Sequence, residues 1–235
     1  MQHRRIALID YRAGNLTSVK KAFAAIGADL FVPESPADLG EAAAVVVPGV
    51  GHFAATRALT SDWVDAIRAG VDTGRPLLGI CLGMQWLFDG SEEAPDCAGL
   101  GVLSGHCYRL SAIASHQSPV ASRQSPVASQ DSRQPSSETS HLRLETSVKI
   151  PHVGWNALDI QRDASIVEGV APGAQVYFTH SFVAPLTSDT VAVTEHGRMF
   201  AAIVQRAHVA GVQFHPEKSG DVGLRILRNF MRWVS

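Results

Sequence analysis

The stretch Leu77-Leu78-Gly79-Ile80-Cys81-Leu82-Gly83-Met84-Gln85 decides the fold of this chain. It begins as an apolar run of strand length, passes through a Gly-x-Cys-x-Gly turn, and continues with the helical pattern of Met84 to Phe88. This order is typical of a nucleophile elbow, here with cysteine where a hydrolase would have serine. Glycine is needed at Gly79 and Gly83, because side chains in so tight a turn would collide with neighbouring backbone.

Cys81 is therefore interpreted as a nucleophile. Its place at the N-terminal end of a helix favours the thiolate form through the helix dipole. The alternative is a buried structural cysteine, the usual role of an isolated one, and the flanking glycines argue against it. Cys97 and Cys107 lack such a setting, and we expect both to be structural. Three cysteines without a Cys-x-x-Cys pair also disfavour a disulfide framework and a structural metal site.

Strands and helices alternate around this stretch. We expect strands at residues 5–9, 31–33, 44–47 and 76–80, and helices at residues 16–26 and 59–71. More strands are expected at residues 175–178, 191–194, 201–204 and 209–214, before a final helix from about residue 221. The N-terminal strands are apolar on both faces, which suits a parallel sheet covered on both sides. The predicted fold class is α/β: one three-layer domain over residues 1–235, with a mixed, mainly parallel sheet flanked by helices.

Composition excludes several classes of protein. With 235 residues, 46% of them hydrophobic, the chain can bury the core of one sizeable domain. Twenty Lys and Arg residues against 22 Asp and Glu residues give a formal charge of -2, which disfavours a nucleic-acid-binding protein. The sequence contains neither an apolar run of membrane-spanning length nor a signal-peptide core. We expect a cytoplasmic enzyme that contacts neither nucleic acid nor membrane.

A serine-rich stretch separates the two halves of the chain. Residues 111–140 contain ten serines and no aromatic residue, and the hexapeptide QSPVAS occurs twice. Such a composition buries too little apolar surface to offset the cost of ordering, so a disordered surface insertion is expected at about residues 111–142. A regulatory or docking segment is the alternative.

A base for Cys81 is expected in the segment Val212-Gln213-Phe214-His215-Pro216-Glu217. If the segment stays extended, the strand period of two places His215 and Glu217 on one face. The carboxylate then holds the imidazole in one tautomer, and the other ring nitrogen meets the sulfur. His-Pro-Glu alone is a weak signal, and it gains its weight from the cysteine elbow.

A glycine-rich turn, Pro48-Gly49-Val50-Gly51, follows the apolar run of residues 44–47. At the carboxyl end of a parallel strand, such a turn points backbone N–H groups into the crevice where ligands bind. Beside a cysteine nucleophile it would form an oxyanion hole. A phosphate-binding loop is the competing interpretation, but the Gly-Lys-Ser/Thr signature is missing.

The motifs PGVG, GICLGMQ and HPE, in this order, resemble those of the triad-type glutamine amidotransferases. The resemblance covers nearly the whole chain apart from the serine-rich stretch, and it implies a flavodoxin-like class I architecture. It also implies hydrolysis of glutamine through a γ-glutamyl thioester, without a metal or an organic cofactor. Cys81 would be the nucleophile, His215 the general base and acid, and Glu217 the residue that orients His215. The N–H groups of Val50 and Leu82 would form the oxyanion hole. The expected glutamine contacts are Gly49, Gln85, Thr179, His180 and Ser181, with the backbone of Phe182.

Four further segments resemble the glutamine amidotransferase subunits of imidazole glycerol phosphate synthases. They are Asp10 to Val19, Pro151-His152-Val153-Gly154-Trp155-Asn156, Tyr177-Phe178-Thr179-His180-Ser181-Phe182 and His215-Pro216-Glu217-Lys218-Ser219. The resemblance implies a heterodimer with a (β/α)8-barrel cyclase subunit, which receives the ammonia. The complex would make imidazole glycerol phosphate and aminoimidazole carboxamide ribonucleotide in histidine biosynthesis. The residues expected to dock the cyclase are Asn15, Trp155, Tyr177 and Lys218.

Arg12 departs from this pattern, which has glycine at that position. If the backbone there needs a positive φ, Arg12 is strained and the local contact with the partner is altered.

Three other functions remain open at this point. One is a subunit of a different synthase, such as one for anthranilate, guanylate or pyridoxal phosphate, although the segments around Asn15 and Trp155 argue against this. A catalytically silent binding subunit is disfavoured by the intact Cys81, His215 and Glu217. A free-standing cysteine peptidase or γ-glutamyl hydrolase would differ in hydrolysing its substrate strongly without a partner.

Overall fold

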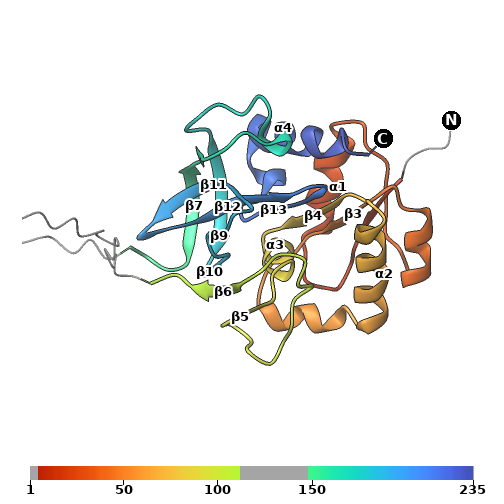
Figure 1. The fold of residues 1–235 in the computed structure, drawn as a ribbon. Helices are drawn as coiled ribbons and strands as arrows, with labels where there is room; N and C mark the ends of the chain where they lie inside the picture. Colours follow the sequence, from red (N-terminus) through yellow and green to blue (C-terminus); the bar gives the residue numbers. More distant parts are fainter. Residues whose placement is uncertain (1–4, 112–147, 235) are drawn as a thin grey trace, which may run out of the picture.

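A central eight-stranded sheet organises the computed structural model, which describes residues 5–111 and 148–234 (Figure 1). The strand order is β2-β1-β3-β4-β13-β12-β11-β8. Its strands are β1 (Ile6–Leu8), β2 (Leu30–Phe31), β3 (Ala44–Val47), β4 (Leu77–Ile80), β8 (Asp159–Ile160), β11 (Thr190–His196), β12 (Arg198–Arg206) and β13 (Val209–Val212). The five strands from β2 to β13 are parallel, and β12, β11 and β8 continue the sheet antiparallel.

Helices cover both faces of this sheet, and two hydrophobic cores result. The helices are α1 (Leu16–Ala24), α2 (Ser61–Asp72), α3 (Leu82–Trp86) and α4 (Gly220–Met231). Phe23 of α1 and Phe230 of α4 belong to one core, whereas Ile67 of α2 and Trp86 of α3 belong to the other. Strand residues alternate between the cores, as the pleat requires. The expected three-layer α/β fold with a mixed, mainly parallel sheet is confirmed.

Two small sheets extend the fold beside the antiparallel strands (Figure 1). One contains β10 (Phe182–Val183), β6 (His106–Arg109) and β5 (Gly90–Ser91), and the other pairs β7 (His152–Ala157) with β9 (Gln175–His180). In the second sheet, Trp155 lies opposite Tyr177 and His152 opposite His180. Of these five strands, only β9 was predicted.

Short 3-10 helices lie between these elements. They are η1 (Pro36–Glu41), η2 (Phe53–Ala58), η3 (Ser165–Val167) and η4 (Pro216–Lys218), and none of them was predicted. The expected insertion at about residues 111–142 lies, from residue 112 onward, outside the described residues. Within the described ranges, no helix combines the length and the apolar character needed to cross a membrane.

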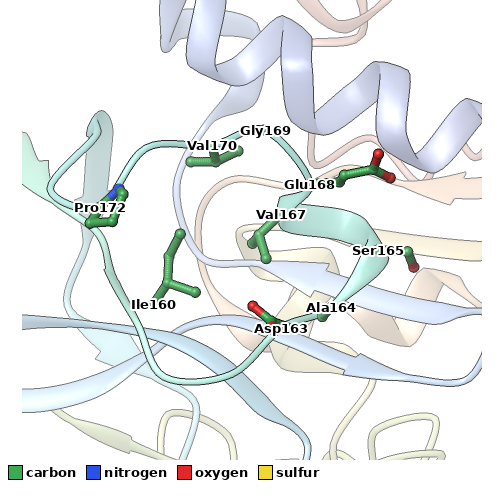
Figure 2. Close-up of a pocket in the computed structure, with 9 residues that line it drawn as sticks. All are labelled: Ile160, Asp163, Ala164, Ser165, Val167, Glu168, Gly169, Val170 and Pro172. Carbon is green, nitrogen blue, oxygen red and sulfur yellow. The ribbon is translucent and has the colours of Figure 1, made fainter.

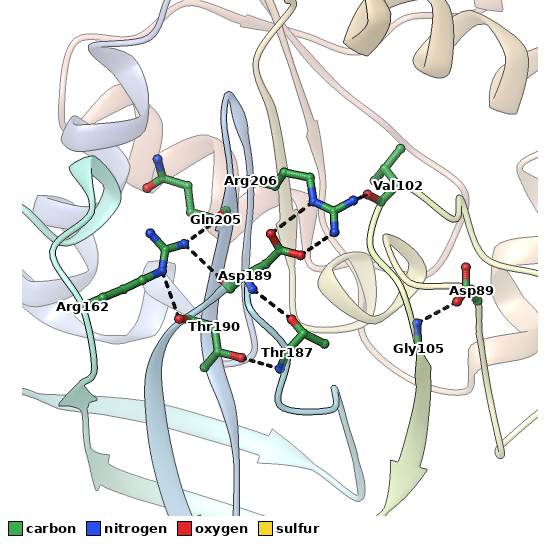
Figure 3. A network of polar contacts seen from close by, with 9 residues as sticks. All are labelled: Asp89, Val102, Gly105, Arg162, Thr187, Asp189, Thr190, Gln205 and Arg206. Atoms are coloured by element: carbon green, nitrogen blue, oxygen red, sulfur yellow. Dashed lines mark hydrogen bonds and ion pairs between the residues drawn. The ribbon is translucent and has the colours of Figure 1, made fainter.

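Arginines tie the outer antiparallel strands together (Figure 3). The guanidinium of Arg162 donates to the carbonyl oxygens of Thr190, Asp189 and Gln205. The Arg206 guanidinium donates two parallel hydrogen bonds of 3.1 and 2.6 Å to the Asp189 carboxylate, and it also donates to the Val102 carbonyl. Such bidentate pairs fix geometry as well as adding energy. The ends of β8, β11 and β12 are thereby held in register.

Candidate active site

The turn between β4 and α3 holds Cys81 in a backbone conformation that side chains rarely adopt. Its φ is 52° and its ψ is -106°, and its N–H donates to the Val212 carbonyl at 2.7 Å. Strain of this kind persists only where the surroundings fix it, and it occurs mainly at functional sites. The strained turn presents the Cys81 thiol beside the ends of the parallel strands.

The two glycines of the turn permit close approach of the backbone. A β-carbon on Gly79 would lie 2.6 Å from the carbonyl oxygen of Gly83, and one on Gly83 would lie 1.8 Å from that of Val47. Real β-carbons do not come this near to a backbone oxygen. The expected steric need for glycine at both positions is confirmed.

Cys81 is buried, with 4% of its surface exposed. Its sulfur lies 4.0 Å from the Thr179 carbonyl oxygen and 3.7 Å from Nε2 of Gln213. Gln213 is wholly buried and was not singled out from the sequence. Its only sequence signal is its place two residues before His215, directly after the apolar strand β13. An amide donor that faces the sulfur suits a thiolate.

His215 and Glu217 form a buried pair. Nδ1 of His215 lies 2.8 Å from Oε1 of Glu217, and 2% and 3% of the two side chains are exposed. The predicted contact is present, but the extended conformation assumed for it is wrong. Pro216 begins the 3-10 turn η4, with Glu217 inside it, so a tight turn brings the side chains together. Proline at a first helical position is pre-organised for this turn.

The other ring nitrogen of His215 faces Cys81. Burial lowers the pKa of His215, but the contacts with Cys81 and then Glu217 outweigh it and raise the pKa to about 10. Nε2 is buried and has no hydrogen bond of normal geometry within the described part of the chain. Because Nδ1 is taken by Glu217, Nε2 is the nitrogen left for the side-chain contact with Cys81 that raises the pKa. The structure brings Cys81, His215 and Glu217 together in that order.

The predicted oxyanion donors are both occupied by carbonyl groups. The Val50 N–H donates to the Ala13 carbonyl at 2.6 Å, and the Leu82 N–H to the Gly49 carbonyl at 3.4 Å. In this conformation the two proposed donors therefore do not form an oxyanion hole. The peptide between Gly49 and Val50 presents its oxygen to Leu82 and turns its N–H away.

Tyr11 is a further residue at this site that the sequence analysis did not assign. Its hydroxyl is buried without a hydrogen-bond partner among the described residues. It touches Gly49, because a β-carbon there would lie 2.0 Å from the hydroxyl oxygen. Burial, and then the charge of Cys81, raise the pKa of Tyr11. The hydroxyl thus lies against the glycine-rich turn, close enough to Cys81 for an electrostatic influence.

A cavity of about 290 Å³ opens beside Cys81. It is lined by Gly51, Cys81, Leu82, Gln85, Glu93, Pro151, Thr179, His180, Ser181 and Phe182. Four of the five residues expected to contact glutamine line it, and Gly49 does not. The Gln85 amide donates to the Phe182 carbonyl at 2.8 Å and to Oε1 of Gln213 at 3.1 Å. Glu93, which was not predicted, fixes the wall by accepting from the Phe53 N–H at 2.7 Å.

Another hollow, of about 720 Å³, lies between β8 and the segment around η3 (Figure 2). Its lining runs from Ile160 to Pro172 and contains none of the predicted site residues. Groups of histidine, cysteine and carboxylate side chains suited to hold a metal ion were not found among the described residues.

Three of the four expected docking residues form one cluster. Trp155 on β7 is 57% exposed, its ring lies 6.0 Å from that of Tyr177, and Nζ of Lys218 lies 5.8 Å from the Tyr177 ring. Asn15 stands apart from the cluster: its side chain caps α1 by accepting from the Ser18 N–H. Because α1 packs against η4, which carries Lys218, Asn15 belongs to the adjoining surface.

Arg12 has a φ of 64°, the left-handed conformation in which glycine is at ease. Its N–H donates to the Asp10 carboxylate at 2.9 Å. The backbone at Arg12 thus has the positive φ that the sequence analysis gave as the condition for strain, and Arg12 is strained.

Comparisons with known proteins agree with this geometry. The family model described as glutamine amidotransferase class-I matches residues 7–233. Solved structures with the same fold include one titled crystal structure of glutamine amidotransferase, with a TM-score of 0.65, 19% identity and coverage of 97% of this chain and 98% of that one. PurLQS from Thermotoga maritima has a TM-score of 0.67 at 15% identity, with 99% and 100% covered. At such identities the likeness concerns the fold alone.

Sequence relatives are more specific. The imidazole glycerol phosphate synthase subunit HisH of Syntrophotalea carbinolica is 40% identical over 229 residues, which cover 96% of this chain and 98% of the relative. HisH of Deinococcus radiodurans is 37% identical over 235 residues, with 97% and 93% covered. The chain belongs to the class-I glutamine amidotransferases, and within them to the family of HisH subunits of imidazole glycerol phosphate synthase.

Proposed function

We propose that this chain hydrolyses glutamine to glutamate and passes the ammonia to a (β/α)8-barrel cyclase subunit. The complex makes imidazole glycerol phosphate and aminoimidazole carboxamide ribonucleotide in histidine biosynthesis. The observation that carries the proposal is the buried group of Cys81, His215 and Glu217, of which Cys81 lines a cavity, in a chain of the HisH family. The cytoplasmic location expected from the sequence stays a prediction.

The chemistry begins with attack by the Cys81 sulfur on the amide carbon of glutamine. A carbon–sulfur bond forms, and the carbonyl oxygen takes the negative charge. His215 gives a proton to the amide nitrogen, the carbon–nitrogen bond breaks, and ammonia leaves behind a γ-glutamyl thioester. Water then attacks the thioester while His215 takes a proton, the carbon–sulfur bond breaks, and glutamate leaves. Glu217 holds His215 through Nδ1 during both steps.

The negative oxygen requires donors that the observed conformation does not offer. Rotation of the peptide between Gly49 and Val50 would remove the Gly49 carbonyl from Leu82 and turn the Val50 N–H inward. The N–H groups of Val50 and Leu82 then act together as the oxyanion hole. Glutamine itself is held in the cavity that Gln85, Thr179, His180 and Ser181 line.

Docking of the cyclase takes place on the surface of Trp155, Tyr177 and Lys218, with Asn15 on the adjoining helix. Exposure of a large aromatic side chain supports this, because tryptophan and tyrosine anchor many interfaces. The strained Arg12 lies in the same N-terminal segment as Asn15, at a position where the family pattern has glycine.

The experiment compares two nitrogen donors in the reconstituted complex. The Cys81→Ala variant should lose glutamine-dependent product formation and keep ammonia-dependent formation, because only amide cleavage needs the sulfur. Cys97→Ala is the matched control: Cys97 is buried against Thr56 and lines no part of the active-site cavity. It should retain both activities.

The alternatives give different results in this experiment. Near wild-type synthesis from glutamine by Cys81→Ala would overturn the nucleophile assignment. Failure of the wild-type chain to support any glutamine-dependent synthesis would indicate a silent subunit or another synthase. Strong hydrolysis by the chain alone would indicate a free-standing hydrolase.

A further inference from the structure

Two buried amide side chains connect the active-site cavity with the sulfur of Cys81. Gln85 lies on α3 and lines the cavity, and Gln213 directly follows β13. Nε2 of Gln85 lies 3.1 Å from Oε1 of Gln213, and Nε2 of Gln213 lies 3.7 Å from the sulfur. Gln85 is 4% exposed and Gln213 is wholly buried, so water does not compete for these contacts.

A backbone carbonyl group fixes which way round the two amides lie. Nε2 of Gln85 lies 2.8 Å from the Phe182 carbonyl oxygen. A carbonyl oxygen only accepts, so the Gln85 atom that faces it is the amide nitrogen. The second N–H of this nitrogen is donated to Gln213, which must present its oxygen there. The other polar atom of the Gln213 side chain, the one that faces the sulfur, is therefore its NH₂ group.

Backbone hydrogen bonds hold Gln213 and Cys81 in place relative to each other. The Gln213 N–H donates to the Ala202 carbonyl of β12 at 2.9 Å. The Cys81 N–H donates at 2.7 Å to the carbonyl of Val212, the residue before Gln213. The amide is thus anchored to the same neighbouring strands as the strained turn that carries the sulfur. A donor fixed in this way does not have to reorganise when charge develops.

The groups around the sulfur distinguish its two protonation states. A thiol can donate its proton to the Thr179 carbonyl oxygen, which lies 4.0 Å away. A thiolate has no proton to donate, and it accepts instead from the Gln213 amide and from the protonated ring of His215. Two donors against one distant acceptor favour the charged form of the sulfur.

We propose that Gln213 is a catalytic residue whose side-chain N–H donates to the Cys81 sulfur, and that Gln85 is a positioning residue that keeps this amide in the donating orientation. The catalytic part rests on the proposed function. The amide stabilises the negative sulfur before it attacks the amide carbon of glutamine. It does so again when the carbon–sulfur bond of the thioester breaks and the electron pair returns to sulfur. Gln213 loses no proton in either step, because His215 carries the proton.

The contact is tested by alkylating Cys81 with iodoacetamide in the full-length chain at a series of pH values. Mass spectrometry of the peptide that contains Cys81 gives the rate. Gln213→Met removes the donor at nearly constant size, so the pH of half-maximal rate should rise by about one unit. The maximal rate at high pH should increase up to about threefold, because a less stabilised thiolate is more nucleophilic. A merely structural change would move the rate in one direction at every pH.

A second variant separates donation from packing. Gln213→Glu keeps the size of the side chain and the oxygen that accepts from Gln85, but it places a carboxylate against the sulfur. Like charges disfavour the thiolate, so the pH of half-maximal rate should rise further than in Gln213→Met. A structural role predicts the opposite order, because glutamate preserves the packing better than methionine.

Gln205→Glu is the matched control, because it makes the same exchange on β12. Nε2 of Gln205 donates to the Ser165 hydroxyl and to the Ala207 carbonyl, and the residue lines no part of the active-site cavity. Its alkylation profile should equal that of the wild type. The other titratable side chains of the site are the same in all these proteins, namely Tyr11, Glu93, His180, His215 and Glu217.

The wild type also allows a measurement that needs no variant. In NMR of ¹⁵N-labelled glutamine side chains, the Nε2 protons of Gln213 should move upfield when Cys81 is alkylated, because their charged acceptor is lost. Those of Gln205 should stay in place. An unmoved Gln213 signal, an unshifted profile in both Gln213 variants, or a smaller shift in Gln213→Glu than in Gln213→Met would overturn the donor role.

Glutaminase assays of the reconstituted complex test the catalytic part. The acid limb of the pH profile of kcat/KM for glutamine should move up by about one unit in Gln213→Met, as the alkylation profile does. An unshifted acid limb would overturn the catalytic role of Gln213. A wild-type complex without glutaminase activity would overturn the proposed function, and the alkylation profiles would still decide whether Gln213 donates to the sulfur.

Discussion

The amide nitrogen of Leu82 lies 3.4 Å from the carbonyl oxygen of Gly49, so one peptide group occupies the place where a negative oxygen would have to be stabilised. The next amide nitrogen, that of Val50, lies 2.6 Å from the Ala13 carbonyl oxygen and points the other way. Both proposed oxyanion donors are satisfied within the chain. This arrangement corresponds to a resting state of the proposed enzyme, in which the proposed nucleophile Cys81 is in place and the proposed oxyanion hole is not assembled.

The chain alone should accordingly be a poor glutaminase. Loss of one oxyanion donor costs about a hundredfold or more in rate, so an increase of that size is expected when the cyclase subunit and its nucleotide are bound. We expect the bound partner to stabilise the conformation with the rotated Gly49–Val50 peptide. Because such coupling is reciprocal, bound glutamine should in turn increase the affinity of the complex for the nucleotide. The measurement is steady-state glutaminase activity of the chain, of the complex, and of the complex with nucleotide. Equal rates in all three would refute gating by this peptide.

Tyr11→Phe should stabilise the protein. The variant removes a buried hydroxyl that has no partner among the described residues, and an unsatisfied group of this kind costs about 1–3 kcal/mol. Urea unfolding should show an increase of roughly 1 kcal/mol in the free energy of unfolding. Tyr108→Phe is the control, because its hydroxyl lies 3.5 Å from the Met199 carbonyl at a partly exposed site. A lower stability for Tyr11→Phe would mean that the hydroxyl has a partner in solution.

Gly83→Ala should be strongly destabilising. Its β-carbon would lie 1.8 Å from the Val47 carbonyl oxygen, and backbone is unable to yield as a flexible side chain does. We expect a loss of about 3 kcal/mol or more on urea unfolding. Gly40→Ala is the matched control, because a β-carbon there meets nothing within 4 Å. A Gly83→Ala protein as stable as Gly40→Ala would show that the turn can relax.

Local patterns were enough to predict the parallel half of the fold. The apolar runs Ala44–Val47 and Leu77–Ile80 are strands β3 and β4 with the expected bounds or within one residue of them. β7 was missed as a strand, because its pairing with β9 depends on contacts distant in sequence and its outward side carries Val153 and Trp155. Glycine at Gly154, with a φ of 138°, further weakens the strand pattern.

The site was predictable where a motif is local. The proximity of Cys81, His215 and Glu217 was predicted from their motifs, although Pro216 already indicated the turn that replaces the assumed strand. Tyr11 and Gln213 were missed because their neighbours are set by sheet order. The orientation of the Gly49 carbonyl depends on two hydrogen bonds, from the Leu82 N–H to Gly49 and from the Val50 N–H to Ala13. The composition of the glycine-rich turn does not predict this orientation.

Arg12→Gly should relieve strain. At a φ of 64°, a residue with a β-carbon lowers the free energy of unfolding by roughly 1 kcal/mol relative to an unstrained backbone. Glycine avoids this strain, but its greater conformational freedom in the unfolded state offsets part of the gain. Arg12→Ala keeps the β-carbon and serves as the control for loss of the charge. The glycine variant should therefore be the more stable of the two by up to about 1 kcal/mol on urea unfolding. Equal stabilities would show that the backbone at Arg12 is not strained.

Acid should destabilise the fold through His152 and His180. Their pKa values in the folded protein are about 4 and about 3, against about 6.5 for an unfolded histidine. Below pH 6.5 the unfolded chain takes up protons at both positions and the folded chain does not. The stability they contribute is therefore complete above pH 6.5 and lost as the pH falls toward 4 and 3.

The titration of His215 does not affect this measurement, because its shifted pKa changes the stability in a different pH range. Its pKa is raised to about 10, so its contribution is complete below pH 6.5 and lost as the pH rises through 10. Below pH 6.5 it is protonated in both states. Urea unfolding of the wild type and of a His152→Gln/His180→Asn double variant at pH 8.0, 7.0, 6.0 and 5.0 separates the two histidines from carboxylates that titrate in both proteins. The wild type should lose up to about 1.4 kcal/mol more per pH unit for each histidine between pH 6 and 5, and the difference should be constant above pH 7. Parallel pH profiles across the acid range would contradict the burial of two neutral imidazoles at His152 and His180.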